Sequence, residues 1–246
     1  MSISRIFNSL LQPHYIYRPS FLFRRIYREW FRSTCSSEIA SLPWGHTLRV
    51  TPTEHIGRSV WLHGIYGLAV CEILWRMARE GMKTVDVGAN IGVMTSVVAH
   101  RVAPSGSVYS FEPHPALYSI LAENVRRWRT SCDVSFCPLP FAVHHRKGYA
   151  FLSWGSSFQH NQGTASLARE APERTRVPCT TLDSLFPSAH LHILKIDVEG
   201  NEQHVIEGAN SLLWEQRVDH ILYECHDGPR ALIHDDLRKR GYTAFS

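Results

Sequence analysis

The sequence predicts an α/β fold with a doubly wound, mostly parallel sheet. Strand-like and helix-like segments alternate from Lys83 onward. Strands such as "LHILKID" and "DHILYEC" are apolar on both faces, as in parallel strands that helices cover on each side. In such a sheet, ligands bind beyond the carboxyl ends of the strands. Functional residues are therefore expected where strands end.

The individual elements follow from the hydrophobic period and from turn residues. Residues 41–64 are expected to form short strands and turns, and 67–81 a helix that ends at Gly81. Short apolar runs then predict strands at 83–88, 107–112, 134–143, 149–154, 191–198 and 219–225, and a last short strand at 242–246. The strand at 149–154 is expected to form a hairpin with the strand at 134–143. Apolar residues at helical spacing predict the helices, which are 91–102, 115–129, 201–214 and 229–240. Residues 155–175, rich in Ser, Gln, Asn and Gly, are expected to form a loop.

Composition excludes several functional classes. The net charge of +4 is spread along the chain, which argues against a nucleic-acid partner. No apolar run reaches the ~18–20 residues of a membrane span. The six cysteines form no CxxC pair and lie mostly among apolar residues, which favours a reducing, cytoplasmic location. The fifteen histidines include no HExxH, and "VHHRKG" at 143–148 is interpreted as a polar turn, so we predict no histidine metal site.

The N-terminal segment differs from the rest of the chain, and we divide the chain into a basic arm at 1–40 and one domain at 41–246. Residues 1–32 contain six arginines, no lysine and a single acid. From Phe21 onward the apolar residues fall on one helical face and the arginines on the other. This amphipathic helix is expected to dock on its own domain or on a second subunit. A peripheral membrane contact or an organelle-targeting peptide are the alternatives.

The segment "TVDVGANIGVMTSVVA" (84–99) contains the main binding signal. A strand ends at Asp86 and Gly88, and a helix opens after Asn90 and Gly92, which predicts a turn of bare backbone for a ligand to lie against. A dinucleotide site has the pattern GxGxxG, but Asn90 replaces its middle glycine. Asp86 suits the cationic head group of an amino acid better than a pyrophosphate. The turn therefore favours a nucleoside with an amino-acid tail.

The next strand ends in "YSFEP", which places Glu112 just beyond its carboxyl end. A carboxylate at this position can accept hydrogen bonds from both ribose hydroxyls. The alternative is that Glu112 only stabilises the start of the following helix. S-adenosylmethionine satisfies both acids, with its ribose at Glu112 and its amino-acid end near Asp86.

Four segments resemble successive motifs of the FkbM-type S-adenosylmethionine-dependent methyltransferases: "VDVGANIGVMTSVVA", "FEPHPALYSILAENV", "TTLDSL" and "LKIDVEGNEQHVIEGA". The resemblance runs from about Gly67 to the C-terminus. It implies a Rossmann-like class I methyltransferase fold, S-adenosyl-L-methionine as cofactor, and methyl transfer to oxygen, often a hydroxyl of a sugar, glycan or natural product. The cofactor residues that it implies are Asp86, Gly88, Asn90, Gly92 and Glu112.

The same resemblance implies a catalytic face at the ends of the next two strands. Its residues are Lys195, Asp197 and Glu199, followed by Glu224 and His226 in "LYECH". The polar segment 161–167 resembles part of the acceptor pocket. The chain departs from the family pattern at His144-His145, where a small residue and Asp or Asn are usual. It also ends at "GYTAFS", so we expect a shortened C-terminal antiparallel hairpin.

These residues suggest a mechanism in which an alcohol is aligned with the methyl group and loses its proton to a base. Asp197, Glu199 and His226 are the candidate bases, and Lys195 can pair with either acid. The cluster could instead be a structural salt-bridge network or hold a divalent cation. We predict an O-methyltransferase acting on a small-molecule or glycan hydroxyl. A non-catalytic partner subunit and a nicotinamide oxidoreductase are the alternatives.

Overall fold

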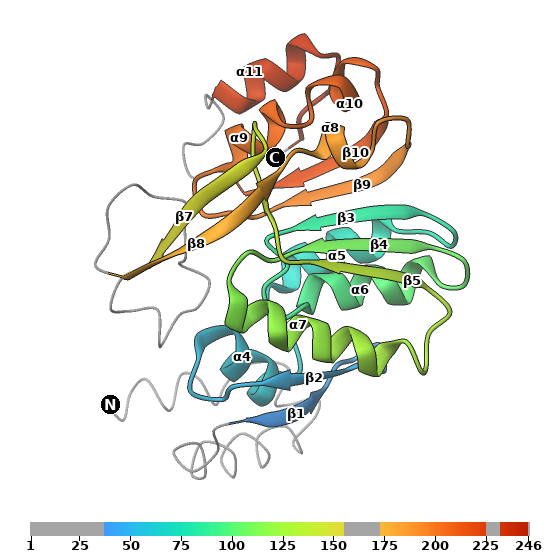
Figure 1. Cartoon of the computed structure of the whole chain (residues 1–246). Coiled ribbons are helices and arrows are strands. Elements are labelled where there is room, and N and C mark those ends of the chain that lie inside the picture. The colour runs from blue at the N-terminus through green and yellow to red at the C-terminus, as the bar shows by residue number, and fades with distance from the viewer. Residues whose placement is uncertain (1–36, 155–172, 225–231, 246) are drawn as a thin grey trace, which may run out of the picture.

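The computed structural model describes residues 37–154, 173–224 and 232–245 (Figure 1). Its strands are β1 (Glu38–Ser41), β2 (Thr47–Val50), β3 (Lys83–Val87), β4 (Ser107–Phe111), β5 (Ser135–Leu139), β6 (Ala142–Val143), β7 (Gly148–Trp154), β8 (Glu173–Thr180), β9 (Leu191–Ile196) and β10 (Val218–Tyr223). Its helices are α4 (His55–His63), α5 (Leu68–Met77), α6 (Val93–Val102), α7 (Pro115–Trp128), α8 (Leu182–Leu185), α9 (Glu202–Glu207), α10 (Asn210–Trp214) and α11 (Leu232–Lys239).

The central sheet confirms the predicted class. Its strand order is β10-β9-β3-β4-β5, and every neighbouring pair is parallel. From β3 the chain first moves outward through β4 to β5 and later returns to β9 on the other side of β3. The carboxyl ends of β3 and β9 therefore meet at a topological switch point, where doubly wound sheets bind their ligands.

Helices cover both faces of this sheet and enclose two separate cores (Figure 1). One face packs against α4 to α7, and the other against α8 to α11. Adjacent residues of one strand serve different cores: Val85 and Val87 of β3 face the second core, while Asp86 points toward α6 and accepts a hydrogen bond from Thr95. This two-sided burial explains why the strands are recognisable as continuous apolar runs.

The two-stranded sheet β1–β2 packs against α7 through buried polar contacts (Figure 1). Trp128 donates its indole N–H to the carbonyl of Thr47, at 2.7 Å. Asn124, fully buried, accepts from the backbone N–H of Arg49 and donates to the carbonyl of Ile91. These bonds attach the chain before Lys83 to the helix beside the glycine turn.

Strand β7 does not form the predicted hairpin with 134–143. That segment breaks into β5 and β6, and β6, β8 and β7 form a separate three-stranded sheet in which β8 pairs with both neighbours. Strand β8 begins inside the segment that was expected to be a loop. Its two arginines lie over aromatic rings of β7, Arg176 over Tyr149 and Arg174 over Phe151, so its exposed face is polar although it is a strand.

Three helix predictions also need correction. Residues 55–63, expected as strand or turn, form α4, which Glu54 caps at its N-terminus and Gly64 ends in the left-handed conformation. Helix α5 ends at Met77, before Gly81. The predicted helix 201–214 is interrupted at Gly208 and Ala209, where α9 ends and α10 begins. A Cβ at Gly208 would lie 2.1 Å from the carbonyl oxygen of His144, so only glycine fits at this break.

The last predicted strand is wrong in its described part, because residues 242–245 belong to no strand. The amphipathic segment 1–32 lies outside the described residues. Of the arm at 1–40 only the end is described, where residues 38–40 belong to β1 and pair with β2. Among the described residues no helix has the length and apolar character needed to cross a membrane.

Candidate active site

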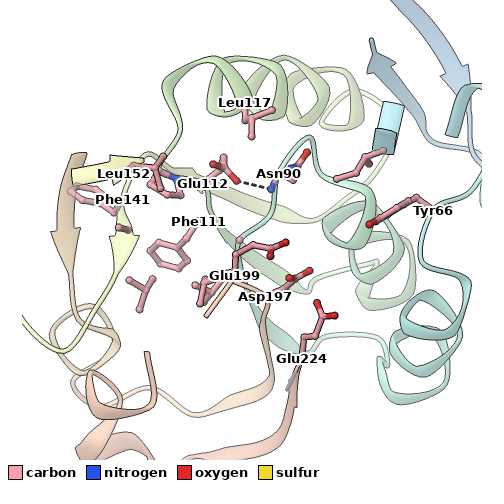
Figure 2. Close-up of a pocket in the computed structure, with 17 residues that line it drawn as sticks. Tyr66, Asn90, Phe111, Glu112, Leu117, Phe141, Leu152, Asp197, Glu199 and Glu224 are labelled. Atoms are coloured by element: carbon pink, nitrogen blue, oxygen red, sulfur yellow. Dashed lines mark hydrogen bonds between the residues drawn. The ribbon is translucent and has the colours of Figure 1, made fainter. Parts of the chain in front are cut away.

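A cleft opens at the switch point, with about 830 Å³ of space including its mouth (Figure 2). It lies at the carboxyl ends of β3, β4, β9 and β10. The lining residues are Ile56, Tyr66, Val87, Gly88, Asn90, Phe111, Glu112, Pro113, Leu117, Phe141, Ala142, Val143, Leu152, Asp197, Val198, Glu199 and Glu224. Most of the predicted site residues that the structure describes therefore come together here, although they are spread over more than a hundred positions of the chain.

Gly88 lines the cleft, but the structure gives a different reason for a glycine at this position from the predicted one, which was room for a ligand. Its φ is +78°, and a Cβ on it would lie 1.8 Å from the carbonyl oxygen of Asp197. The bare backbone thus lets β3 and β9 approach each other, rather than leaving room for a ligand. Gly92 likewise accommodates protein, because a Cβ there would meet the side chains of Leu121 and Trp128 within 3 Å.

Asn90 has the positive φ of 52° that asparagine tolerates better than most residues. Its side-chain oxygen accepts the backbone N–H of Ile91, and its own backbone N–H donates to Glu112, at 2.9 Å (Figure 2). The other carboxylate oxygen of Glu112 accepts the backbone N–H of His114, at 2.8 Å. The turn and the end of β4 are thereby held in one arrangement.

Glu112 is only 6% exposed, yet it lines the cleft. Burial raises the pKa of Glu112 to about 7, although the two backbone N–H donors and the charge of Lys195 work in the opposite direction. Each carboxylate oxygen has two lone pairs and uses one on the backbone. Glu112 can therefore accept two further hydrogen bonds from a ligand in the cleft.

Asp86 does not face the cleft, contrary to the prediction that it contacts the head group of the ligand. Its carboxylate is 3% exposed, accepts from the hydroxyl of Thr95 at 2.6 Å, and lies 3.0 Å from the Nζ of Lys195. Its position on β3 points it into the sheet–helix interface, because alternate residues of a strand face opposite sides. Asp86 is thus an internal partner of Lys195.

Lys195 is buried among three oxygens at the switch point. Its Nζ lies 3.0 Å from Asp86, 3.0 Å from the carbonyl of Gly88 and 3.5 Å from Asp197. Burial lowers the pKa of Lys195, but the carboxylates of Asp86 and Asp197 outweigh it and raise the pKa above its ordinary value. Lys195 therefore stays charged and fixes the positions of both acids.

Asp197 and Glu199 both line the cleft (Figure 2). The side chain of Asp197 is 42% exposed, and its backbone N–H donates to Val87. Glu199 has a φ of 53°, which is uncommon for a residue with a side chain. Glu202 accepts the backbone N–H groups of Val198 and Gly200 and so holds this loop in place.

Two residues at the acidic end of the cleft complete its lining. Glu224, exposed, follows β10, and Tyr66 lies in the link between α4 and α5 (Figure 2). Burial, and next the charges of Asp197, Glu224 and Glu199, raise the pKa of Tyr66, which keeps its hydroxyl protonated. Glu224 was expected from the motif "LYECH". Tyr66 was not, since nothing in its local sequence marks a functional residue.

The opposite end of the cleft is apolar. Phe111, Leu117, Phe141 and Leu152 gather there, beside Glu112 (Figure 2). Leu152 comes from β7, so the small sheet contributes to the site as well. The cleft therefore has an apolar end, a buried carboxylate near its middle and an acidic end.

Two predicted site features lie outside the described residues, namely His226 and the polar segment 161–167. A feature that the sequence did not predict lies close by: the rings of His144, His145 and His204 gather beside the cleft, with ring centroids 4.2–5.1 Å apart. The interpretation of "VHHRKG" as a plain polar turn was therefore incomplete.

Comparison with known proteins agrees with this geometry. The chain matches the family described as "Methyltransferase FkbM domain" over residues 86–243. It is 27% identical over 197 residues to 31-O-demethyl-FK506 methyltransferase FkbM of Streptomyces tacrolimicus, covering 68% of this chain and 75% of that protein. It is 26% identical over 174 residues to hexuronic acid methyltransferase AglP of Haloferax volcanii, covering 65% of this chain and 62% of that protein.

A solved SAM-dependent O-methyltransferase from Thermotoga maritima aligns with a TM-score of 0.41 and 16% identity, over 87% of this chain and 64% of that one. The fold assignment rests instead on the strand order and the parallel pairing. The match to the FkbM domain spans more than half of the chain and includes the described acids of the cleft. The chain therefore belongs to the FkbM family of methyltransferases, whose cofactor is S-adenosylmethionine.

Proposed function

We propose that this protein transfers the methyl group of S-adenosylmethionine to a hydroxyl oxygen of a neutral sugar, glycan or natural product. The observation that carries the proposal is the acidic end of the cleft, where Asp197, Glu199 and Glu224 converge next to the glycine turn (Figure 2). An alcohol has to lose its proton as it attacks, and a positioned base contributes on the order of 10²–10⁴-fold to such a step.

The cleft fits the cofactor in three places. Glu112 has free lone pairs for the ribose hydroxyls, and the apolar end between Leu117 and Phe141 suits a flat adenine ring. The backbone of Gly88 and Asn90 borders the space between Glu112 and Asp197, where the amino-acid end belongs. When bound, S-adenosylmethionine supplies an activated methyl group on a sulfonium.

We assign the proton transfer to the acids of the loop after β9. The ion pair with Lys195 holds Asp197 in a defined position, which suits it to orient the acceptor hydroxyl by accepting its hydrogen bond. Glu199, which also lines the cleft, would take the proton that the hydroxyl loses while the methyl group passes from the sulfonium sulfur to the oxygen. Lys195 cannot act as the base, because both neighbouring carboxylates keep it protonated.

Charge also restricts the acceptor. Among the described residues that line the cleft there are four acids and no lysine, arginine or histidine. An anionic acceptor would be repelled at the acidic end, since like charges a few ångströms apart in a partly buried site disfavour each other. A hexuronic acid, the acceptor class in the name of the Haloferax protein, is therefore expected to be a poor acceptor here.

The experiment uses the full chain with methyl-labelled S-adenosylmethionine and a panel of neutral glycosides and polyols, each matched with its uronic acid. We expect label in a methyl ether of a neutral acceptor, located by mass spectrometry and stable to mild base. Label that mild base releases would indicate a methyl ester, and label on nitrogen or carbon would indicate another reaction class. Either result would contradict O-methylation of a hydroxyl. Tight binding of S-adenosylhomocysteine without turnover on any acceptor would favour the partner-subunit alternative.

A further inference from the structure

Three histidines from two distant parts of the chain form a compact cluster beside the cleft. His144 and His145 follow β6, and His204 lies on α9. One nitrogen from each ring can be chosen so that the three atoms all lie within 4.8 Å of one another. His144 and His204 stack with an interplanar angle of 11° and a centroid separation of 4.6 Å.

The backbone brings these rings close together. His144 donates its N–H to the carbonyl of Thr180, and the carbonyl of Gly208 accepts the N–H of Asp183, so the turn and the end of α9 attach to one segment. A Cβ at Gly208 would lie 2.1 Å from the His144 carbonyl oxygen. The missing side chain therefore lets the histidine turn rest against the end of α9.

The chemistry of the cluster is better explained by a bound cation than by three imidazoles that bind nothing. Imidazole nitrogen is the commonest metal ligand in proteins, and one nitrogen from each of the three rings comes within reach of a single ion here. The Nδ1 of His204 is buried and has no hydrogen-bond partner among the described residues. Such a group normally has a partner, and a bound cation would supply one.

We propose that His144, His145 and His204 bind one divalent transition metal of the zinc class. Glu207, whose carboxylate lies 3.9 Å from the Nδ1 of His145, or a water molecule would complete a tetrahedral set. Mg²⁺ and Ca²⁺ are unsuitable, because both prefer oxygen ligands. The histidine turn and α9 thus form a site separate from the acids that we assign to methyl transfer.

Binding one metal ion would require only a small movement of the three histidine rings toward one another. Zinc–nitrogen bonds of ~2.0–2.1 Å place two tetrahedral ligand atoms about 3.3 Å apart, so the nitrogens draw together by at most about 1.5 Å. The parallel rings of His144 and His204 have to tilt apart as they do so. His145 is exposed, so solvent rather than packed protein borders the space in which its ring would turn toward the others.

The location gives the metal a structural role. Val143, adjacent to the cluster, lines the apolar side of the cleft, while α9 starts at Glu202, which holds the loop of Asp197 and Glu199. A metal bound by both segments would fix the two sides of the cleft relative to each other.

The test is zinc binding to the full chain after chelation and desalting, measured by isothermal titration and by competition with a chromophoric chelator. We expect one Zn²⁺ per chain. His145→Ala and His204→Ala should each weaken binding at least tenfold, since each removes one of three ligands. His190→Ala is the matched control, because it removes one histidine from the separate His190–His192 pair, whose rings lie 5.4 Å apart, and should leave affinity unchanged.

A second readout is thermal. Zn²⁺ should raise the melting temperature of the wild type and of His190→Ala, and neither of the other variants should respond. The melting temperature without metal shows whether each variant folds. If His204→Ala fails to fold, His145→Ala decides the test, because His145 is exposed and its replacement should not disturb the fold. Absence of saturable zinc binding to the wild type, or unchanged affinity in His145→Ala, would overturn the proposal.

Discussion

Asp86 and Lys195 lie in register on the neighbouring parallel strands β3 and β9, and their charged groups meet at 3.0 Å inside the sheet–helix interface. The same Nζ reaches Asp197 at the edge of the cleft. One buried charge thus connects the interior of the domain to its candidate catalytic face. A change at Lys195 is therefore expected to affect both stability and activity, whereas changes at Asp86 and at Asp197 test the two separately.

Replacing Lys195 with Met is expected to lower the free energy of unfolding by about 3–5 kcal/mol, because it leaves the carboxylate of Asp86 buried and uncompensated. Chemical denaturation measures the loss. The double variant with Asp86→Asn should recover part of it, since the orphaned charge is gone. Arg76→Met breaks the exposed pair with Glu72 and should cost less than about 1 kcal/mol. Equal costs for Lys195→Met and Arg76→Met would show that the internal pair is unimportant.

Gly88→Ala tests the reason for the glycine turn. The new Cβ would combine left-handed strain with a backbone clash against Asp197, and we expect a loss of about 2–6 kcal/mol in the free energy of unfolding. Gly45 has a φ of +91°, and a Cβ on it would meet no atom within 4 Å, so Gly45→Ala should cost only about 1–2 kcal/mol. Urea denaturation of both variants gives the comparison. A Gly88→Ala protein as stable as Gly45→Ala would contradict the close approach of β3 and β9.

Glu112→Gln should weaken binding of S-adenosylhomocysteine at least tenfold, because hydrogen bonds to a charged acceptor are worth ~1.5–3 kcal/mol. Calorimetry measures the affinity. Glu123→Gln, on α7 and paired with Arg49 and Arg127, is the matched control and should bind normally. Normal affinity in a folded Glu112→Gln protein would disprove the ribose assignment.

The raised pKa of Glu112 adds a pH dependence. Its carboxyl gains a proton as the pH falls through about 7, and the neutral form is the weaker acceptor. The affinity ratio between wild type and Glu112→Gln should therefore shrink from about pH 8 to about pH 6. Comparing the two proteins in the same buffers cancels any titration of the ligand itself. A ratio that stays constant over this range would show that Glu112 does not titrate there.

Asp197→Asn and Glu199→Gln test the catalytic assignment on an acceptor found in the labelling screen. Each amide keeps the size of the side chain and removes its charge, so turnover should fall by on the order of 10²-fold or more while cofactor affinity stays nearly unchanged. Glu215→Gln, an exposed acid paired with Arg217 outside the cleft, should retain full turnover. A lowered melting temperature with normal turnover per folded molecule would assign the acids a structural role.

The sheet was largely predictable from the sequence, because strands buried on both faces leave a local signal. Strands β3, β4, β9 and β10 start and end within two residues of their predicted bounds. Strand β8 was missed because its exposed arginines, which pack on the aromatic rings of β7, make it resemble a polar loop. Its pairing depends on a partner far along the chain, which no local pattern records.

The site was predictable where chemistry follows a strand end. Glu112, Asp197 and Glu199 line the cleft, and their roles remain predictions. The reasons for an acid at position 86 and a glycine at position 88 lie in tertiary contacts. Asp86 pairs with Lys195, and Gly88 leaves room for the backbone of Asp197, and both partners come from another part of the chain. Tyr66 reaches the cleft only because of where the link between α4 and α5 lies. His204 lies some 60 positions after His144, so the histidine cluster exists only in the folded chain.

The attachment of β1–β2 to α7 means that the segment matched by the FkbM domain is shorter than the packed unit to which it belongs. The family match begins at residue 86, inside β3. A chain trimmed to that match would lose the partners of Asn124 and Trp128 and would open one of the two cores to water. Anyone shortening this protein for expression should therefore keep the chain from Ser37 onward, because domain boundaries drawn from sequence similarity would cut through its interior.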